Sequence, residues 1–390
     1  MDDHVDELAS ANGGFRGGQA WGPAALPAAR DEVLTPVFTG SGKEYFRIWI
    51  VNLFLTVATL GIYSAWAKVR RLQYFDRNTQ LGGAVFDFRG DPKAILRGRL
   101  LALAMLVCYH YAFGFASTIS FVIIGLLAIA LPFLMRGALR FRLRNTEYRG
   151  IRFAFTGSAA GAYATFLPIL LIFVLPGLLI TIAPTNPLVF LSFLLYLLWP
   201  VLHGAMARYQ HNNASFGAAH SCYTVSPWRF YKFYLIAFGL SLAATAAFAI
   251  AAVAVAMLGK ALGNNAWWTM AATVGGVLLY YIAVLMCIPY MTARIANLTW
   301  SNTSFPGITI TSAMSARAFA RLQVVNVLLT IVTLGLFRPF AVVRIHRFRL
   351  AAMTIVASGG FEHVVAQAAA AAGSASGDGA ADFFGFDFSW

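Results

Sequence analysis

The stretch VNLFLTVATLGIYSAWAKVRR at residues 51–71 returns in similar form as VNVLLTIVTLGLFRPFAVVRI at residues 325–345. Both copies begin with an apolar run, contain a Thr-Leu-Gly element and continue into residues that include arginine. Two such copies near the ends of one chain indicate internal repetition. Further copies are therefore expected in the residues between them.

The composition predicts a membrane protein. Of the 390 residues, 59% are hydrophobic and 11% are charged, whereas soluble domains are about one quarter charged. Six apolar runs approach or exceed the roughly 18 to 20 residues that cross a bilayer as a helix. They lie at residues 100–117, 119–135, 164–182, 188–205, 234–258 and 268–292. We predict an α-helical polytopic membrane protein.

Proline and asparagine recur at a fixed spacing in the later part of these runs. The full pairs are Pro132 with Asn145, Pro200 with Asn213 and Pro289 with Asn302, while the terminal copies keep Asn78 and Pro339. A turn that contains glycine and a short alternating stretch follow each asparagine, which favours a β-hairpin that leads into the next helix. The sequence thus predicts about five pseudo-repeats of strand, helix, turn, helix and strand, in which these prolines and asparagines have structural roles.

The expected domain organisation follows from the repeats. Residues 1–34 are predicted to form a disordered tail, residues 35–357 a single membrane domain, and residues 358–390 a flexible tail with an aromatic and acidic end. Two interpretations of that end stay open, namely docking on a protein partner and fraying. The repeats are expected at about 36–82, 83–150, 151–217, 218–307 and 308–357.

The outer strands of the repeat array lack sequence neighbours. The strand expected at 36–40 has no upstream partner, and AAMTIVAS at 351–358 has no downstream partner. Pairing these two strands would remove two exposed sheet edges. It would also close the repeats into a ring, with the first and last repeats side by side. An open arc would produce the same sequence pattern.

The distribution of positive charge predicts the orientation. Nearly all of the 29 Lys and Arg residues lie in or near the expected hairpins, the exceptions being Arg16, Arg30 and Lys260. Because basic residues stay on the cytoplasmic side, the hairpins and both termini are expected there.

The first and last repeats are short. Residues 45–70 and 319–344 are too few for two full crossings. Single spans would move the internal hairpins to the outside, against the charge rule. We therefore prefer re-entrant half-helices or short hairpins that break at Gly61 and Gly335.

Residues 38–99, which include the TLGIY, AWAKVR and NT elements, resemble the YjgN family of bacterial inner-membrane proteins, also described as domain of unknown function 898. The resemblance covers roughly residues 36–357, and the ending DFFGFDFSW is similar to a terminal motif of many members. It implies a bacterial inner-membrane location and no established activity or catalytic residue. The middle repeat departs from the pattern, with NASFGAAHSCYTVS in place of Asn-Thr and few basic residues.

The sequence offers little catalytic chemistry. Acidic residues are absent from the apolar runs and from the whole stretch between Glu147 and Glu362. Proton-coupled carriers usually need an intramembrane carboxylate, and acid–base hydrolysis needs a carboxylate or histidine pair. The three cysteines are far apart, and no nucleic-acid module accompanies the basic residues. We expect no enzyme, no cofactor, no metal site and no nucleic-acid partner.

Four polar residues in or near the apolar runs are candidate intramembrane sites, namely Asn52, Asn326, His110 and His203. Each is of a type that lines a transport path or coordinates a substrate at a broken helix. Hydrogen bonding between helices is the favoured interpretation for the histidines and fits the asparagines at least as well.

The basic hairpins are expected to form a positive collar that contacts anionic headgroups at the cytoplasmic face. Orientation and attraction to the bilayer explain such a collar, at about 1 kcal/mol per basic residue. The forked guanidinium also suits a bound phospholipid or anionic metabolite. The candidate residues are Arg70, Arg71, Arg77, Arg136, Arg140, Arg144, Arg344 and Arg347.

Two functions agree with these features. A transport or pore-type protein for a small anionic solute or lipid is preferred, because repeated bundles commonly build central pathways. The alternative is a non-catalytic scaffold or lipid-organising protein that binds an envelope partner, which the aromatic tail and the apolar spans favour.

Overall fold

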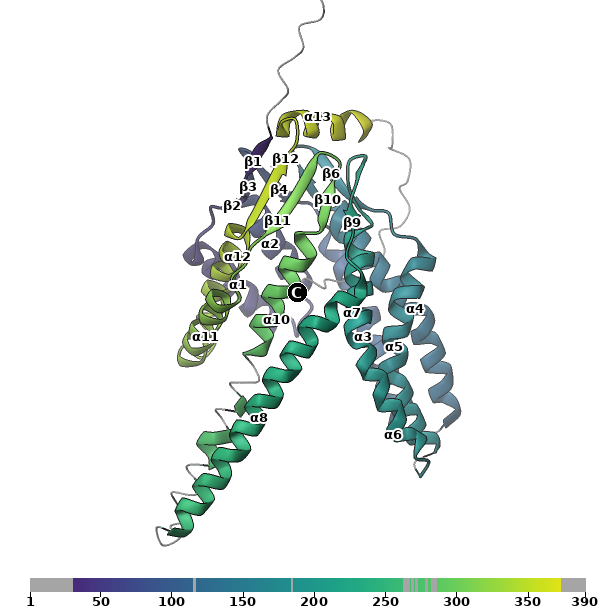
Figure 1. The fold of residues 1–390 in the computed structure, drawn as a ribbon. Helices are drawn as coiled ribbons and strands as arrows, with labels where there is room; N and C mark the ends of the chain where they lie inside the picture. The colour runs from purple at the N-terminus through teal and green to yellow at the C-terminus, as the bar shows by residue number, and fades with distance from the viewer. Residues whose placement is uncertain are drawn as a thin grey trace, which may run out of the picture.

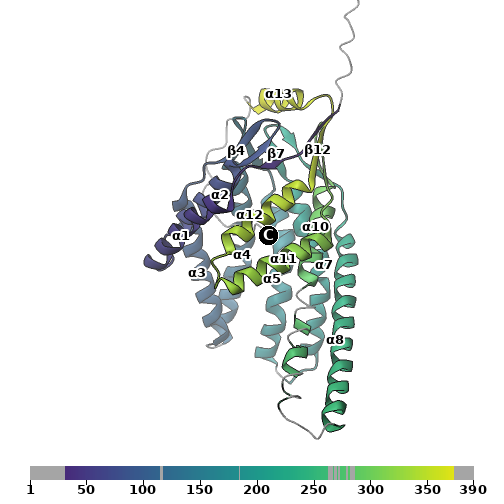
Figure 2. The ribbon, with the colours of Figure 1, turned by 90° about the vertical axis from the view of Figure 1, so that its left-hand side faces the viewer.

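The computed structural model describes residues 31–114, 117–183, 185–261, 267, 270, 273–277, 280–281 and 286–372. The described part is mostly helical, with its strands gathered at one end and the long helices extending away from them (Figure 1). Figure 2 shows the same division after a quarter turn. The fold therefore has a layer of strands at one end and a helical part that faces away from it.

The strands form two antiparallel sheets, which we call the strand layer. The first has the order β1 (Glu32–Leu34), β12 (Met353–Ala357), β11 (Ile308–Ser312), β10 (Thr303–Phe305) and β9 (Cys222–Tyr223). The second has the order β2 (Val37–Phe38), β3 (Thr79–Leu81), β4 (Ala84–Phe88), β5 (Thr146–Tyr148), β6 (Ile151–Phe155), β7 (Ala214–Phe216) and β8 (Ala219–His220). The predicted hairpins are present as β3–β4, β5–β6, β7–β8 and β10–β11.

The asparagines that follow the helices act as caps. The side-chain amides of Asn78, Asn145, Asn213 and Asn302 each donate to the backbone carbonyl four residues earlier, at 2.7 to 2.8 Å. These bonds satisfy carbonyl groups that a helix end otherwise leaves without a partner. The chain can then turn directly into the hairpin that follows.

Four segments of the described residues are long and apolar enough to cross a membrane, at 121–144, 159–182, 188–211 and 227–261. They include most of α4 (Ser117–Arg144), all of α5 (Ala159–Ile182), the run of α6 (Leu188–Ser192), η1 (Phe193–Leu198) and α7 (Trp199–His211), and η2 (Pro227–Arg229) with α8 (Phe230–Ala261). The first predicted run falls in α3 (Pro92–Gly114). The last is described only in part and ends in α10 (Cys287–Trp300).

The marker prolines occupy buried positions in these helices. Pro132 lies inside α4 and Pro289 inside α10, whereas Pro200 lies in the first turn of α7. Pro339 lies in the first turn of α12 (Arg338–Ala351). At a helix start, proline loses no hydrogen bond and its fixed φ suits the helix.

Each terminal repeat contains a helical hairpin, formed by α1 (Gly42–Ala58) with α2 (Ser64–Arg77) and by α11 (Ala316–Val332) with α12. The two turns have the same geometry, because φ is 50° at both Leu60 and Leu334, 91° at Gly61 and 93° at Gly335. The longer helix of each hairpin, α1 or α11, spans about 25 Å. This is less than the roughly 30 Å of a hydrocarbon core. Both apolar turns are exposed.

The two ends of the chain meet. Helix α1 contacts α12, with the Phe46 and Phe340 rings 5.6 Å apart. The Arg347 guanidinium donates to the Gly40 carbonyl at 2.9 Å. Strand β1 pairs with β12. The N-terminal and C-terminal segments of the described chain therefore lie side by side.

Two boundary predictions need correction at the N-terminal side. The strand near 36–40, present as β2, pairs with β3 rather than with the last strand. The strand that reaches β12 is β1, within residues 1–34 that the sequence assigned to the tail. Pro36 separates the two strands, and a proline cannot donate to a ladder, so β1 and β2 pair in different sheets.

The C-terminal prediction also needs correction, because α13 (Phe361–Ala372) forms inside the predicted flexible tail at 358–390. The helix lies across the end of the strand layer (Figure 1). Its apolar residues Phe361, Val364, Val365 and Ala368 follow the i, i+3, i+4, i+7 spacing of one helix face and are buried. Residues 1–30 and 373–390 lie outside the described part, so the tail predictions there stay predictions.

Candidate functional site

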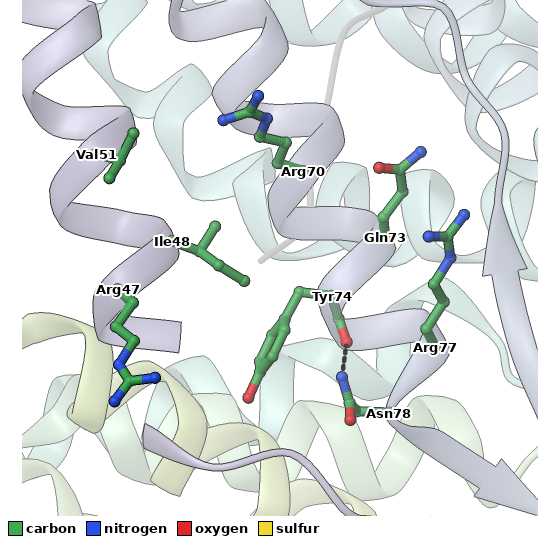
Figure 3. Close-up of a pocket in the computed structure, with 8 residues that line it drawn as sticks. All are labelled: Arg47, Ile48, Val51, Arg70, Gln73, Tyr74, Arg77 and Asn78. Atoms are coloured by element: carbon green, nitrogen blue, oxygen red, sulfur yellow. Dashed lines mark hydrogen bonds between the residues drawn. The ribbon is translucent and has the colours of Figure 1, made fainter. Parts of the chain in front are cut away.

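A pocket of about 520 Å³ lies between α1 and α2, the two helices of the N-terminal helical hairpin (Figure 3). Helix α1 provides its first wall and α2 its second. The lining residues are Arg47, Ile48, Val51, Arg70, Gln73, Tyr74, Arg77 and Asn78. The pocket thus combines three guanidinium groups with aliphatic side chains.

The three arginines stand at different points around the pocket and have different partners. Within the described part of the chain, Arg47 makes no hydrogen bond or ion pair. The Arg70 guanidinium carbon lies 5.7 Å from the centroid of the Tyr63 ring. Arg77 donates to the Asp87 carboxylate at 2.7 Å. Among the described residues, Arg77 is the one of these three arginines that pairs with a carboxylate, so the pocket retains positive charge.

The polar groups at the floor of the pocket are neutral and held in place. The Tyr74 hydroxyl donates to the Ser41 carbonyl at 2.7 Å. Burial, followed by the nearby Glu44 carboxylate, raises the pKa of Tyr74 to about 12, so the phenol stays protonated. The Asn78 amide donates to the Tyr74 carbonyl at 2.7 Å, as drawn in Figure 3.

The pocket continues into an exposed apolar surface on α1. Val51 in the lining is 49% exposed, and Phe54 and Val57, nearer the turn, are 72% and 69% exposed. The turn residue Leu60 is 95% exposed. Such a continuous apolar stretch marks a surface for lipid or protein. A forked guanidinium binds phosphate in two hydrogen bonds, so the surface and pocket together suit an anionic amphiphile.

Arg136, Arg344 and Arg347 of the predicted collar each hydrogen-bond to another part of the chain and do not line the first pocket. The Arg136 guanidinium donates to the Gly157 carbonyl at 2.7 Å, as Arg347 does to Gly40. Both carbonyls belong to the Phe-Thr-Gly-Ser elements that precede a helix. Arg344 donates to the Asn326 side-chain oxygen at 3.3 Å.

The remaining predicted arginines do not gather with the first pocket. Arg144 lines a second pocket of about 110 Å³ together with Arg89, Asn145, Glu147 and Arg152. Within it, Arg89 pairs with Glu147 at 3.3 Å. Arg71 on α2 and Arg140 on α4 are not in the lining of either pocket. The structure thus brings Arg70 and Arg77 together and distributes the others.

Asn52 on α1 and Asn326 on α11 occupy equivalent buried positions, with 7% and 2% of their surface exposed. Among the described residues, the Asn52 side-chain oxygen and the Asn326 side-chain nitrogen have no hydrogen-bond partner. The histidines differ from each other. His110 is exposed on α3, whereas His203 lies 2.9 Å from the Tyr234 hydroxyl, which also accepts from Trp199 at 2.9 Å. These bonds join α7 to α8.

A family described as bacterial protein of unknown function (DUF898) matches residues 34–383. The chain belongs to this family. Two similar proteins are the inner membrane protein YjgN of Salmonella typhimurium LT2, 34% identical over 146 residues, and that of Escherichia coli K12, 33% identical over 144 residues. Each match covers 35% of this chain and 35% of the relative, so it spans about a third of the relatives' length. No solved structure matches significantly.

In this DUF898 chain, the sequence prediction missed Arg47 and Gln73 of the pocket. A signal for Arg47 exists, because Arg47 and Arg321 each stand five residues before the duplicated Asn52 and Asn326. No comparable signal marks Gln73. Among the described residues, no group of three or more His, Cys, Asp and Glu side chains is placed to hold a metal ion.

Proposed function

We propose that this DUF898 protein binds an anionic phospholipid in the pocket between α1 and α2 and transports it. The observation that carries the proposal is the junction of three guanidinium groups with an exposed apolar helix face. Arg47, Arg70 and Arg77 would bind the phosphate, while Val51 and Phe54 would lie along the acyl chains. The pocket then takes lipid laterally from the bilayer.

The proposed location is the bacterial inner membrane, with the strand layer and both termini in the cytoplasm. Support comes from the similar inner membrane proteins YjgN and from the four apolar segments. It also comes from the charge rule, because the helix ends near the strand layer carry arginines such as Arg77 and Arg144.

The proposed architecture is a closed circle of about five repeats. Support comes from the order of the strands, because β3–β4, β5–β6 and β7–β8 pair in succession in one sheet, whereas β10–β11 pairs with β12 and β12 with β1 in the other. The two sheets adjoin along the chain at Pro36 and at Ser221, between β8 and β9. The end strands of the two sheets, β1, β9, β2 and β8, would lie beside other strands in such a circle, which would protect their edges.

A lipid-organising scaffold would use the same pocket without moving lipid. This second proposal is favoured by the exposed apolar turns of the two terminal helical hairpins. The helices of these hairpins are too short for a full crossing of the bilayer. Neither proposal assigns catalysis or nucleic-acid binding to the chain. A protein partner would be bound through residues 378–390, which lie outside the described part.

Native mass spectrometry and a flux assay test the proposal together. In the first, detergent-purified protein is mixed with phosphatidylglycerol or phosphatidylcholine, and we expect preferential retention of phosphatidylglycerol. Replacing Arg47 and Arg70 by glutamine should lower this retention roughly tenfold, because each charged hydrogen bond contributes about 1.5 to 3 kcal/mol when formed and part of that is lost to solvent screening. In the second, vesicles report movement of a fluorescent phosphatidylglycerol between leaflets.

The matched control is Arg317→Gln with Arg321→Gln, which removes two exposed arginines from α11, the equivalent helix of the last repeat. Binding that falls equally in both double variants would mean general surface attraction and would refute the pocket. Retention of phosphatidylglycerol without flux would favour the scaffold over transport.

A further inference from the structure

Helix α13 is seated on an apolar face of the strand layer. Phe361, Val365 and Ala368 are 3%, 7% and 3% exposed, and they share one core cluster with Tyr148 and Phe216. The same cluster includes Leu81, Ile151 and Ala357, with Leu34, Ala84, Phe86, Phe153, Phe305 and Ile355 packed against it. The apolar face that contacts α13, which we call the seat, therefore includes residues of both sheets.

The turns of the hairpins approach α13 closely. A Cβ atom added at Gly82 would lie 2.8 Å from the Phe361 ring, and one at Gly307 would lie 2.9 Å from Val364. One at Gly217 would collide with the Ala368 carbonyl. Glycine at these turns lets the helix settle against the backbone of three hairpins.

One charged contact joins α13 to the hairpin of β5 and β6. Arg149 donates to both oxygens of the Glu362 carboxylate at 2.7 Å and to the Gly82 carbonyl at 2.5 Å. Its guanidinium carbon also lies 5.4 Å from the Phe361 ring centroid. Arg149 has a φ of 49°. At the equivalent position in the turn between β3 and β4, the residue with this conformation is a glycine, Gly82. A strained residue held in this way indicates a role for its side chain.

The backbone of the segment that connects β12 to α13 has the freedom to rotate. Gly359 and Gly360 follow Ser358 after the strand, with φ of 80° and 93°. Apart from the adjacent residues, no described atom lies within 4 Å of where a Cβ would stand at either position. Two unhindered glycines between packed elements have the character of a hinge.

We propose that α13 is a reversible lid over the apolar face of the strand layer, hinged at Gly359 and Gly360 and latched by Arg149 and Glu362. In the closed state, α13 itself occupies the seat. In the open state, the helix swings away as a unit while the strand layer stays folded. The Glu362 side of the latch is 79% exposed, so water and salt reach the ion pair.

Hydrogen–deuterium exchange of the full chain in lipid nanodiscs tests the lid. We expect the amides of residues 361–372 to exchange faster than those of β11 in the native protein, because the lid opens without unfolding the sheets. Glu362→Gln should accelerate the exchange of α13 about two- to fivefold, the effect of losing an exposed ion pair, and leave β11 unchanged. Alanine at both Gly359 and Gly360 should accelerate it further, because the closed φ values strain alanine.

The matched control is Arg152→Gln, which removes an exposed arginine from the same hairpin as Arg149. It should leave the exchange of α13 at the native rate. Faster α13 exchange in Glu362→Gln and in Arg149→Gln, with native rates in Arg152→Gln, supports the latch. Unchanged α13 exchange in Glu362→Gln, or a rise shared equally by α13 and β11, overturns the proposal.

Discussion

His346 of α12 is enclosed by aromatic rings, with its ring centroid 4.9 Å from that of Phe38 and 4.8 Å from that of Phe75. Its Nε2 lies 3.2 Å from the Thr79 hydroxyl. Burial, and then the charges of Arg349 and Arg71, lower the pKa of His346 to about 4 from an ordinary 6.5. The unfolded chain therefore binds the proton first as the pH falls below 6.5, so this contribution to stability is complete above pH 6.5 and lost toward pH 4.

We expect His346→Gln to remove part of the pH dependence of unfolding in detergent. The native protein should lose on the order of 3 kcal/mol more than the variant between pH 7 and pH 4. Thermal unfolding followed by circular dichroism at several pH values measures this difference. His363→Gln, which alters an exposed histidine of α13, is the control. Parallel pH profiles for the native protein and His346→Gln would contradict the assignment.

At the scale of elements, the helix caps explain how each repeat turns from helix to hairpin. The Asn145 amide donates to the Phe141 carbonyl at 2.7 Å, and the Asn145 carbonyl accepts from the Arg89 backbone at 2.9 Å. Ala352 occupies the matching position in the last repeat and keeps only the backbone bond, from Ala313 at 2.9 Å. Asn145→Ala should therefore lower the free energy of unfolding by about 1 kcal/mol.

The reverse change supplies the control for this cap. Ala352→Asn should stabilise the protein by a similar amount, because the carbonyls at positions 145 and 352 accept equivalent backbone hydrogen bonds. Differential scanning calorimetry of both variants gives the comparison. Stabilisation by Asn145→Ala, or no change in either variant, would show that the amide bond adds nothing to the helix end.

At the scale of the whole molecule, β1 joins the two ends of the chain. It pairs with β12 from Glu32 to Leu34, and the Glu32 carboxylate accepts from the Phe361 backbone at 2.9 Å. A chain that lacks residues 1–34 should lose about 2 kcal/mol of unfolding free energy, because these ladder and cap bonds are lost. The backbone amides of β12 should also exchange hydrogen faster in this truncated chain.

A chain that lacks only residues 1–30 is the matched control for this deletion. It retains β1 and should keep the native exchange in β12. Equal protection of β12 in both truncated chains would mean that β1 does not contribute to the closure between the first and last repeats.

The sequence by itself determined the elements whose cause is local. Apolar runs that approach or exceed a bilayer crossing predicted long apolar helices, and the recurring asparagines predicted where helices end and hairpins begin, because helix caps and turns depend on neighbours within a few residues. The duplicated Thr-Leu-Gly elements predicted matching turns at Gly61 and Gly335, and these turns have nearly the same backbone angles.

The tertiary structure alone decided which distant residues meet. The sequence placed Arg70 and Arg77 in one collar, but only the packing of α1 on α2 adds Arg47 to them. It assigned α13 to a flexible tail, because an alanine-rich segment gains its stability from the surface that it buries. It paired the last strand with residues 36–40, although β1 takes that place. Contacts between residues hundreds of positions apart depend on the shape of the whole fold, which local spacing does not encode.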